Sequence, residues 1–299
     1  MHLLINNKNM NSNTYVVIGS NGQLGSELKE LSASNPASFK FYDYPDIDIT
    51  KKENLLAILK QDAPAAIINC AAYTAVDKAE SESDLAMAVN GDGVKNLAEV
   101  AEAIDAWLIH VSTDYVFDGS AHRPYVETDA TNPCSAYGRT KLAGENFATT
   151  YRKGVVVRTA WLYSSFGANF VKTMLRLGAE RDSLNVVFDQ VGTPTYARDL
   201  ASALLAIADN ATSSNNLSLA GIYHYSNEGV CSWYDFTREI FDLCNISCKV
   251  LPIESSSYPT PAKRPHYSVF NKAKIKATFQ IEIPHWKHSL INCLNKLNK

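Results

Sequence analysis

The sequence predicts an α/β fold with a doubly wound parallel β-sheet, followed by a smaller α/β lobe. Two observations support this prediction. Short apolar runs of strand length alternate with segments of helical periodicity through the first half of the chain, and the first run passes directly into a glycine-rich turn that opens a helix. Strands separated by helices form parallel sheets with right-handed crossovers. The 299 residues suffice for one large or two smaller domains.

Five apolar runs in the first half of the chain are strand-like, at 15–18, 39–42, 65–69, 106–111 and 155–158. Helical periodicity separates them, at 26–31, 53–60, 84–104 and 135–145. After residue 161 the pattern loosens. Helices are expected at 169–178, 197–209, 232–244 and from 286, and strand-like runs stand at 222–225 and 249–253. The alternation predicts a sheet whose strands all end at one edge, where open α/β sheets bind ligands.

A glycine-rich turn follows the first predicted strand, as Gly19-Ser-Asn-Gly22-Gln-Leu-Gly25. Glycines at such a turn let the backbone approach a pyrophosphate, which then lies on the N-terminus of the next helix. Asp43 ends the second strand, eighteen residues after Gly25, where an acid can accept hydrogen bonds from an adenosine ribose. The pattern predicts a Rossmann-like dinucleotide site. A plain helix-capping turn is the alternative.

Tyr137 and Lys141 lie four residues apart in a predicted helix, so both side chains project from one face. A nearby ammonium favours the phenolate and lowers the pKa of a phenol, which can then exchange a proton with a carbonyl oxygen. Taken alone, the spacing also fits an ordinary amphipathic helix with a half-buried tyrosine. The fourth strand carries Thr113 and Asp114 toward the same edge of the sheet.

Composition excludes several classes of protein. Hydrophobic residues make up 46% and charged residues 20% of the chain, and the net charge of −3 provides no basic surface for nucleic acid or an anionic membrane. The six cysteines show no Cys-x-x-Cys spacing, which predicts reduced thiols in a cytoplasmic protein. No apolar run is long enough to span a bilayer. The seven histidines show no zinc-like pairing, and His110, inside a predicted strand, is interpreted as a core histidine.

These patterns predict that the chain is divided into three parts. Residues 1–14 are Asn-rich and are predicted to be a disordered extension. Residues 15–161 are predicted to form the dinucleotide-binding domain. Residues 162–299 are predicted to form mainly the second lobe, with segments around 186–225 returning to the first domain.

Eight segments together resemble the extended short-chain dehydrogenase/reductase superfamily and, within it, the dTDP-4-dehydrorhamnose reductase family. They occur in family order across nearly the whole chain, at 19–25, 69–80, 112–119, 125–127, 137–145, 158–163, 192–195 and 260–265. The resemblance implies a Rossmann-like domain, a smaller α/β substrate-binding lobe, a nicotinamide cofactor and a dTDP-sugar substrate. It adds no nucleic-acid or membrane partner and leaves a homodimer open.

The resemblance also assigns roles to residues. It implies that Thr113, Tyr137 and Lys141 form the catalytic triad, with the last two also contacting the cofactor. The other implied cofactor-binding residues are Gly19, Gly22, Gln23, Leu24, Gly25, Asp43, Asp48, Ile49, Ala71, Ala72 and Tyr73. The implied substrate-binding residues are Thr74, Val76, Thr113, Asp114, Tyr115, Trp161 and Arg264. No metal is expected, because Arg198 stands where some relatives hold a metal-binding glutamate, although Glu27 matches another such position.

The implied activity is reduction of the C4 ketone of a 4-ketosugar nucleotide by NADH or NADPH. Asp43 without a closely following cation favours NADH mildly, because a carboxylate repels a 2′-phosphate. Two alternatives remain. The first is another reductase or a dehydratase of the same superfamily, although Tyr115 stands where dehydratases place an acid. The second is a non-catalytic regulatory subunit, similar to the beta subunit of methionine adenosyltransferase.

Overall fold

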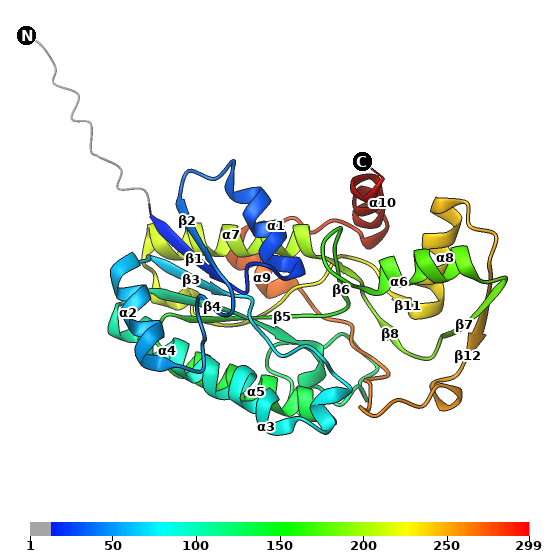
Figure 1. Cartoon of the computed structure of the whole chain (residues 1–299), viewed down its shortest axis with the longest axis horizontal. Helices are drawn as coiled ribbons and strands as arrows, with labels where there is room; N and C mark the ends of the chain where they lie inside the picture. Colours follow the sequence, from blue (N-terminus) through cyan, green and yellow to red (C-terminus); the bar gives the residue numbers. More distant parts are fainter. Residues whose placement is uncertain (1–12, 299) are drawn as a thin grey trace, which may run out of the picture.

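The structure, a computed structural model, describes residues 13–298 and is organised around a six-stranded parallel sheet (Figure 1). The strand order across the sheet is β10-β5-β4-β3-β1-β2, and every neighbouring pair is parallel. The strands are β1 (Thr14–Ile18), β2 (Ser38–Tyr42), β3 (Ala66–Asn69), β4 (Trp107–Thr113), β5 (Gly154–Thr159) and β10 (Gly221–His224). The predicted doubly wound α/β fold is confirmed.

Helices cover both faces of this sheet, so its strands are apolar on both sides (Figure 1). On one face lie α1 (Gln23–Ser32), α7 (Ala197–Ser214) and α9 (Ala273–Phe279). On the other lie α2 (Lys52–Asp62), α4 (Gly93–Ala103) and α5 (Ala136–Thr150). The short helix α3 (Ser83–Met87) continues through a π-turn (Ala88–Asp92) into α4. Buried leucine, valine and alanine side chains form one core on each face.

A second lobe has its own core (Figure 1). Its helices are α6 (Phe170–Glu180), α8 (Trp233–Cys244) and α10 (Trp286–Leu297), and its parallel strands are β7 (Ser183–Val187) and β12 (Lys249–Ile253). Two short strand pairs join this region: β6 (Leu162–Tyr163) with β9 (Thr195–Tyr196), and β8 (Val191–Gly192) with β11 (Cys231–Ser232). Phe236 and Trp286 pack edge to face in the core.

The second half of the chain contributes to both parts. Helices α7 and α9 and strand β10 pack on the central sheet, whereas α6, α8 and α10 build the other core. One expectation at the N-terminus is wrong in its boundary, because β1 starts at Thr14 and pairs there with Ser38 of β2. Residues 1–12 of the predicted extension lie outside the described residues.

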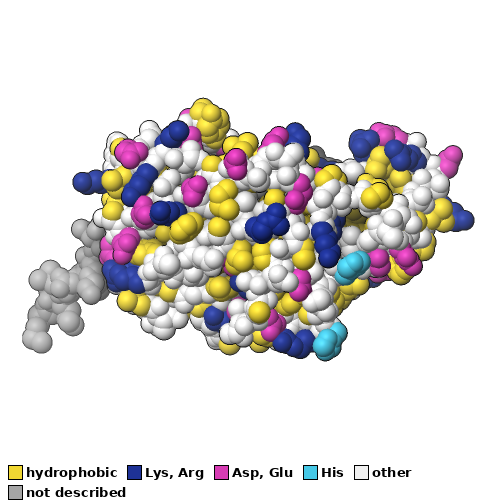
Figure 2. All heavy atoms as spheres, turned by 90° about the horizontal axis from the view of Figure 1, so that it is seen from below, with side chains coloured by type: hydrophobic (Ala, Val, Ile, Leu, Met, Phe, Trp, Pro, Cys, Tyr) yellow, Lys and Arg dark blue, Asp and Glu magenta, His cyan; other side chains and the backbone are white. Residues whose placement is uncertain are grey.

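The surface carries charges of both signs. Figure 2 shows lysine and arginine side chains interspersed with aspartate and glutamate on the face it presents, with scattered apolar groups between them. In the part of the chain from 13 to 298, no helix combines the length and apolar character needed to cross a membrane.

Candidate active site

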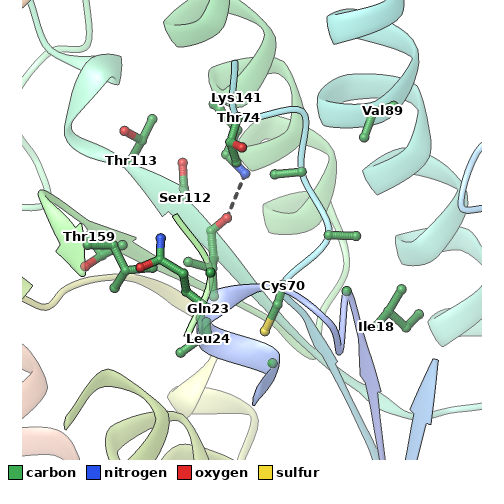
Figure 3. Close-up of a pocket in the computed structure, with 18 of the residues that line it drawn as sticks. Ile18, Gln23, Leu24, Cys70, Thr74, Val89, Ser112, Thr113, Lys141 and Thr159 are labelled. Carbon is green, nitrogen blue, oxygen red and sulfur yellow. Dashed lines mark hydrogen bonds between the residues drawn. The ribbon is translucent and has the colours of Figure 1, made fainter. Parts of the chain in front are cut away.

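A cavity of about 760 Å³ opens at the carboxyl edge of the central sheet (Figure 3). After β1 the chain passes to β2 on one side and then to β3 on the other, which makes the β1/β3 boundary the topological switch point of the sheet. The loops after β1, β3, β4 and β5 all reach the cavity. Its wall includes Gly19, Gly22, Gln23, Leu24, Gly25, Asp43, Asp48, Ile49, Ala71, Ala72, Thr74, Val76, Thr113, Asp114, Tyr115, Tyr137, Lys141 and Trp161.

The glycine turn closes tightly against the loop after β3. Gly19 has a φ of +81°, and a Cβ at this position would lie 2.5 Å from the backbone nitrogen of Ala71. Only glycine avoids both the left-handed strain and this clash. Helix α1 begins at Gln23, and its N-cap residue Gly22 has no side chain to accept a hydrogen bond. The backbone N–H groups of the first turn are therefore free to donate to a ligand at the cavity edge. This arrangement suits a bound phosphate.

Asp43, directly after β2, lies beside the glycine turn. Its carboxylate accepts hydrogen bonds from the backbone N–H groups of Asn21, at 2.7 Å, and Tyr44, at 2.8 Å. These bonds hold the side chain at the cavity wall. The carboxylate oxygens keep further lone pairs that can accept hydrogen bonds from a ligand. Lys52, the first residue of α2, is paired with Glu99 at 2.5 Å.

Three buried polar atoms in the cavity wall have no hydrogen-bond partner within the described residues. They are Gln23 Oε1, Ser112 Oγ and Thr159 Oγ1. Figure 3 shows Gln23 at the start of α1 beside Thr159, with Ser112 at the end of β4. Buried polar groups are normally satisfied, so such a cluster points to a polar ligand. Together with the glycine turn and Asp43, it fits a nicotinamide dinucleotide.

Tyr137 and Lys141 lie one turn apart on α5, whose register is set by Ser135 at its N-cap. Burial raises the pKa of the Tyr137 phenol, Asp114 and Tyr115 add to the rise, and a hydrogen bond with Thr113 opposes it. Burial lowers the pKa of Lys141 to about 8. Its Nζ donates to the carbonyl of Val111 at 2.7 Å, the dashed line in Figure 3. The expected lowering of the phenol's pKa by the ammonium is therefore wrong for this structure, because burial dominates.

Thr113 and Asp114 end β4 and enter a 3₁₀ turn. The Thr113 hydroxyl donates to Asp114 Oδ1 at 3.0 Å and accepts from the N–H of Tyr115 at 3.2 Å. Burial raises the pKa of the Asp114 carboxyl to about 6, against hydrogen bonds from Thr113 and Ser268. The Tyr115 ring meets Tyr137 edge to face, with ring centroids 5.4 Å apart.

Trp161 follows β5 in the left-handed region, with a φ of +50°. For a bulky residue this conformation is strained and needs support from its surroundings. Trp233 at the start of α8 supplies that support, because the two indoles stack with centroids 3.6 Å apart. Trp161 therefore joins the cavity wall to the second lobe.

Two expected ligand-binding residues, Tyr73 and Arg264, are not among the residues that line this cavity. The Tyr73 hydroxyl donates to Glu82, and its backbone N–H donates to Asn90 at 2.9 Å. Arg264 contacts the Tyr115 hydroxyl at 3.1 Å and Asp77 at 2.8 Å, and it lines a second cavity of about 470 Å³. Cys70, Ser112 and Thr159 also line the cavity but were not among the predicted site residues. Each stands at the carboxyl end of a strand, which is the signal that could have found them.

Glu27, which matched a metal-binding position of relatives, is fully buried and held by basic residues. Lys296 Nζ lies 2.9 Å and Arg198 Nη1 lies 3.4 Å from its carboxylate, and Ser164 donates to it at 2.6 Å. Across residues 13–298 no cluster of three or more His, Cys, Asp or Glu side chains has metal-binding geometry.

Comparison with known proteins agrees with this geometry. The family described as the RmlD substrate binding domain matches residues 13–299. A dTDP-4-dehydrorhamnose reductase from Sinorhizobium fredii is 43% identical over 278 residues, covering 91% of this chain and 94% of the relative. Crystal structures of two further proteins of that name are similar. The one from Clostridium acetobutylicum has a TM-score of 0.91 at 44% identity and covers 96% of this chain and 100% of its own.

The second, from Bacillus anthracis in complex with NADP, has a TM-score of 0.90 at 37% identity and covers 95% of this chain and 99% of its own. The family match extends through both parts of the structure, the central sheet as well as the second lobe. This chain belongs to the RmlD substrate binding domain family.

Proposed function

We propose that the protein uses a reduced nicotinamide dinucleotide to convert the C4 ketone of dTDP-4-dehydro-L-rhamnose into the alcohol of dTDP-L-rhamnose. The observation that carries the proposal is a single cavity that joins the glycine turn and Asp43 at one end to Thr113, Tyr137 and Trp161 at the other. The relatives named as dTDP-4-dehydrorhamnose reductases support the choice of substrate.

The chain's own residues supply the proton and the orientation. The cofactor, when bound, supplies the hydride. Tyr137 starts as a neutral phenol, because its pKa is raised, and so holds the proton that the ketone oxygen needs. Thr113 donates to Asp114 Oδ1 at 3.0 Å and stands beside the phenol, so it helps to position the phenol oxygen. Tyr115 packs against the Tyr137 ring and limits its rotation.

The same proposal includes binding of either cofactor with a mild preference for NADH. Asp43 and Asp48 line the cavity, Lys52 is engaged by Glu99, and Lys51 lies close enough to Asp48 to help lower the pKa of its carboxyl. A carboxylate there accepts hydrogen bonds from two free ribose hydroxyls and repels a 2′-phosphate. The relative crystallised with NADP supports use of NADPH as well.

Turnover assays test the proposal. Purified protein is mixed with dTDP-4-dehydro-L-rhamnose and NADH or NADPH, loss of the reduced nicotinamide absorbance is followed, and the product is identified by NMR. We expect one cofactor oxidised per alcohol formed. Tyr137→Phe is the matched control, since it removes one hydroxyl and keeps the ring against Tyr115. A dehydrated ketosugar without net cofactor oxidation, or cofactor binding without turnover of any 4-ketosugar nucleotide, contradicts the proposal.

We also infer a cytoplasmic location, supported by six cysteines that are all unpaired in the structure. Self-association as a homodimer stays a prediction, which size-exclusion chromatography with light scattering tests directly.

A further inference from the structure

A line of three buried polar side chains runs behind the cavity wall. Asn69 ends β3, His110 lies opposite it in register on β4, and Lys141 reaches them from α5. Asn69 and His110 are 0% exposed, and Lys141 is 2% exposed. Asn69 Nδ2 lies 3.0 Å from His110 Nδ1, and His110 Nε2 lies 3.4 Å from Lys141 Nζ. The resemblance to the reductase family implies a catalytic role for the lysine, but neither the resemblance nor the proposed reaction assigns a role to the other two.

The hydrogen bonds determine which nitrogen of His110 carries its proton. Asn69 Oδ1 accepts from the backbone N–H of Ala71 at 3.1 Å, and a backbone N–H can only donate, so the amide cannot be flipped. The amide nitrogen of Asn69 therefore faces His110 Nδ1, which must act as an acceptor. Burial holds the pKa of His110 well below its usual value, so the ring is neutral. A neutral ring with an unprotonated Nδ1 carries its hydrogen on Nε2.

That Nε2–H points at Lys141. An ammonium has three donors and no lone pair, so it gains nothing from an N–H directed at it, whereas an amine can accept. The carbonyl of Val111 takes one lysine N–H at 2.7 Å. We propose that Asn69 and His110 are positioning residues that fix the imidazole tautomer and, through it, favour the amine form of Lys141.

Other groups around the lysine act on the same equilibrium. Burial lowers the pKa of Lys141, whereas Glu145 one turn further along α5 and Cys70 after β3 raise it. Glu145 is neutralised by Arg158 of β5, whose Nη2 lies 2.7 Å from its carboxylate, and Tyr137 stands one turn before the lysine on α5. Besides the Val111 carbonyl at 2.7 Å, the His110 N–H at 3.4 Å is the uncharged polar group in contact with the lysine nitrogen, and its orientation can shift the balance without bringing a charge.

The first test uses the ligand-free wild-type protein, so its result does not depend on the proposed reaction. Nitrogen-15 NMR of labelled histidine distinguishes the two tautomers, and loss of one signal set in His110→Phe assigns the ring. We expect an unprotonated Nδ1 and a protonated Nε2. A proton on Nδ1 overturns the proposal, because Nε2 would then accept from the ammonium and stabilise it.

The second test measures the titration of the Lys141 side chain by NMR in wild type and His110→Phe, with Lys141→Met assigning the signal. Removing the N–H should move the half-titration of Lys141 to higher pH by about one unit. A shift to lower pH, or none, contradicts the proposal, whereas a purely space-filling histidine predicts none. His224→Phe is the matched control, since this second buried strand histidine contacts Arg158 instead of Lys141 and should leave the lysine titration unchanged.

A third variant keeps the test decisive if His110→Phe does not fold. Asn69→Asp preserves an acceptor for the Ala71 N–H and offers a second oxygen to Nδ1, which must then carry the hydrogen. We expect the tautomer to switch to Nδ1–H in this variant. Retention of the Nε2–H form in Asn69→Asp shows that Asn69 does not set the tautomer and refutes its assigned role.

Discussion

Replacing Lys141 by Met should stabilise the folded protein. The pKa of Lys141 falls from 10.5 in an exposed lysine to about 8, and burial is the largest cause. This difference corresponds to roughly 3 kcal/mol of unfavourable free energy at neutral pH. Methionine has no charge to bury, but it leaves the Val111 carbonyl without its lysine donor, a loss of about 1–2 kcal/mol. The net gain should be about 2 kcal/mol.

The sign of the pH dependence follows from the same values. Between about pH 8 and 10.5 the unfolded lysine binds a proton that the folded lysine has lost, so the stability of wild type rises across this window. The gain in the free energy of unfolding of Lys141→Met over wild type should therefore be largest near pH 7 and smaller by about 2 kcal/mol at pH 9.5. Urea denaturation at the two pH values, followed by tryptophan fluorescence, measures both quantities.

Lys153→Met is the control for this experiment. Lys153 is also buried but pairs with Asp105 at 2.9 Å, so its removal should destabilise the protein. A Lys141→Met variant that is less stable than wild type at pH 7, or a difference independent of pH, would refute the reasoning.

Three further predictions concern the same cavity. Tyr137→Phe should lower kcat at least about a hundredfold with little change in cofactor affinity, because only the proton donor is lost. Steady-state kinetics and cofactor titration measure the two quantities. A wild-type rate would show that Tyr137 is not the proton donor. Asp43→Ala should raise kcat/KM for NADPH relative to NADH several-fold, because the repulsion between the carboxylate and the 2′-phosphate, about 1 kcal/mol, disappears. A wild-type protein that strongly prefers NADPH would mean that Asp43 does not face the ribose. Asp114→Asn should stabilise the protein at pH 7 by up to about 3 kcal/mol. Burial raises the carboxyl pKa from 3.8 to about 6, so ionisation of the buried carboxyl destabilises the folded state above that pH, and asparagine does not ionise. That gain should shrink as the pH falls through 6 and be almost lost at pH 3.5, which is below the carboxyl pKa of both states; thermal melts at pH 7 and pH 3.5 compare the two cases.

Local pattern was sufficient for most of the central sheet. The apolar runs at 15–18 and 155–158 lie within β1 and β5, because a strand buried on both faces is continuously apolar and easily recognised. The two-residue strands β6, β8, β9 and β11 were not predicted, since two residues carry no periodicity and pair only when the rest of the fold brings them together. Helix α9 was also missed, because its seven residues are too few for a clear amphipathic pattern.

The sequence by itself determined where the first five parallel strands lie along the chain, the glycine turn after β1 and the shared helical face of Tyr137 and Lys141, because each depends on the pattern within one segment. Only the tertiary structure decided how those two side chains ionise. The pKa of Tyr137 depends on burial and on Thr113, Asp114 and Tyr115 from β4 and the following turn. The pKa of Lys141 depends on burial and on the charges of Glu145 and Cys70. Burial outweighs the helical pairing and raises the pKa of the phenol, the reverse of what the spacing predicts. The left-handed Trp161 likewise depends on Trp233, which lies far away in the sequence and meets it only in the folded chain.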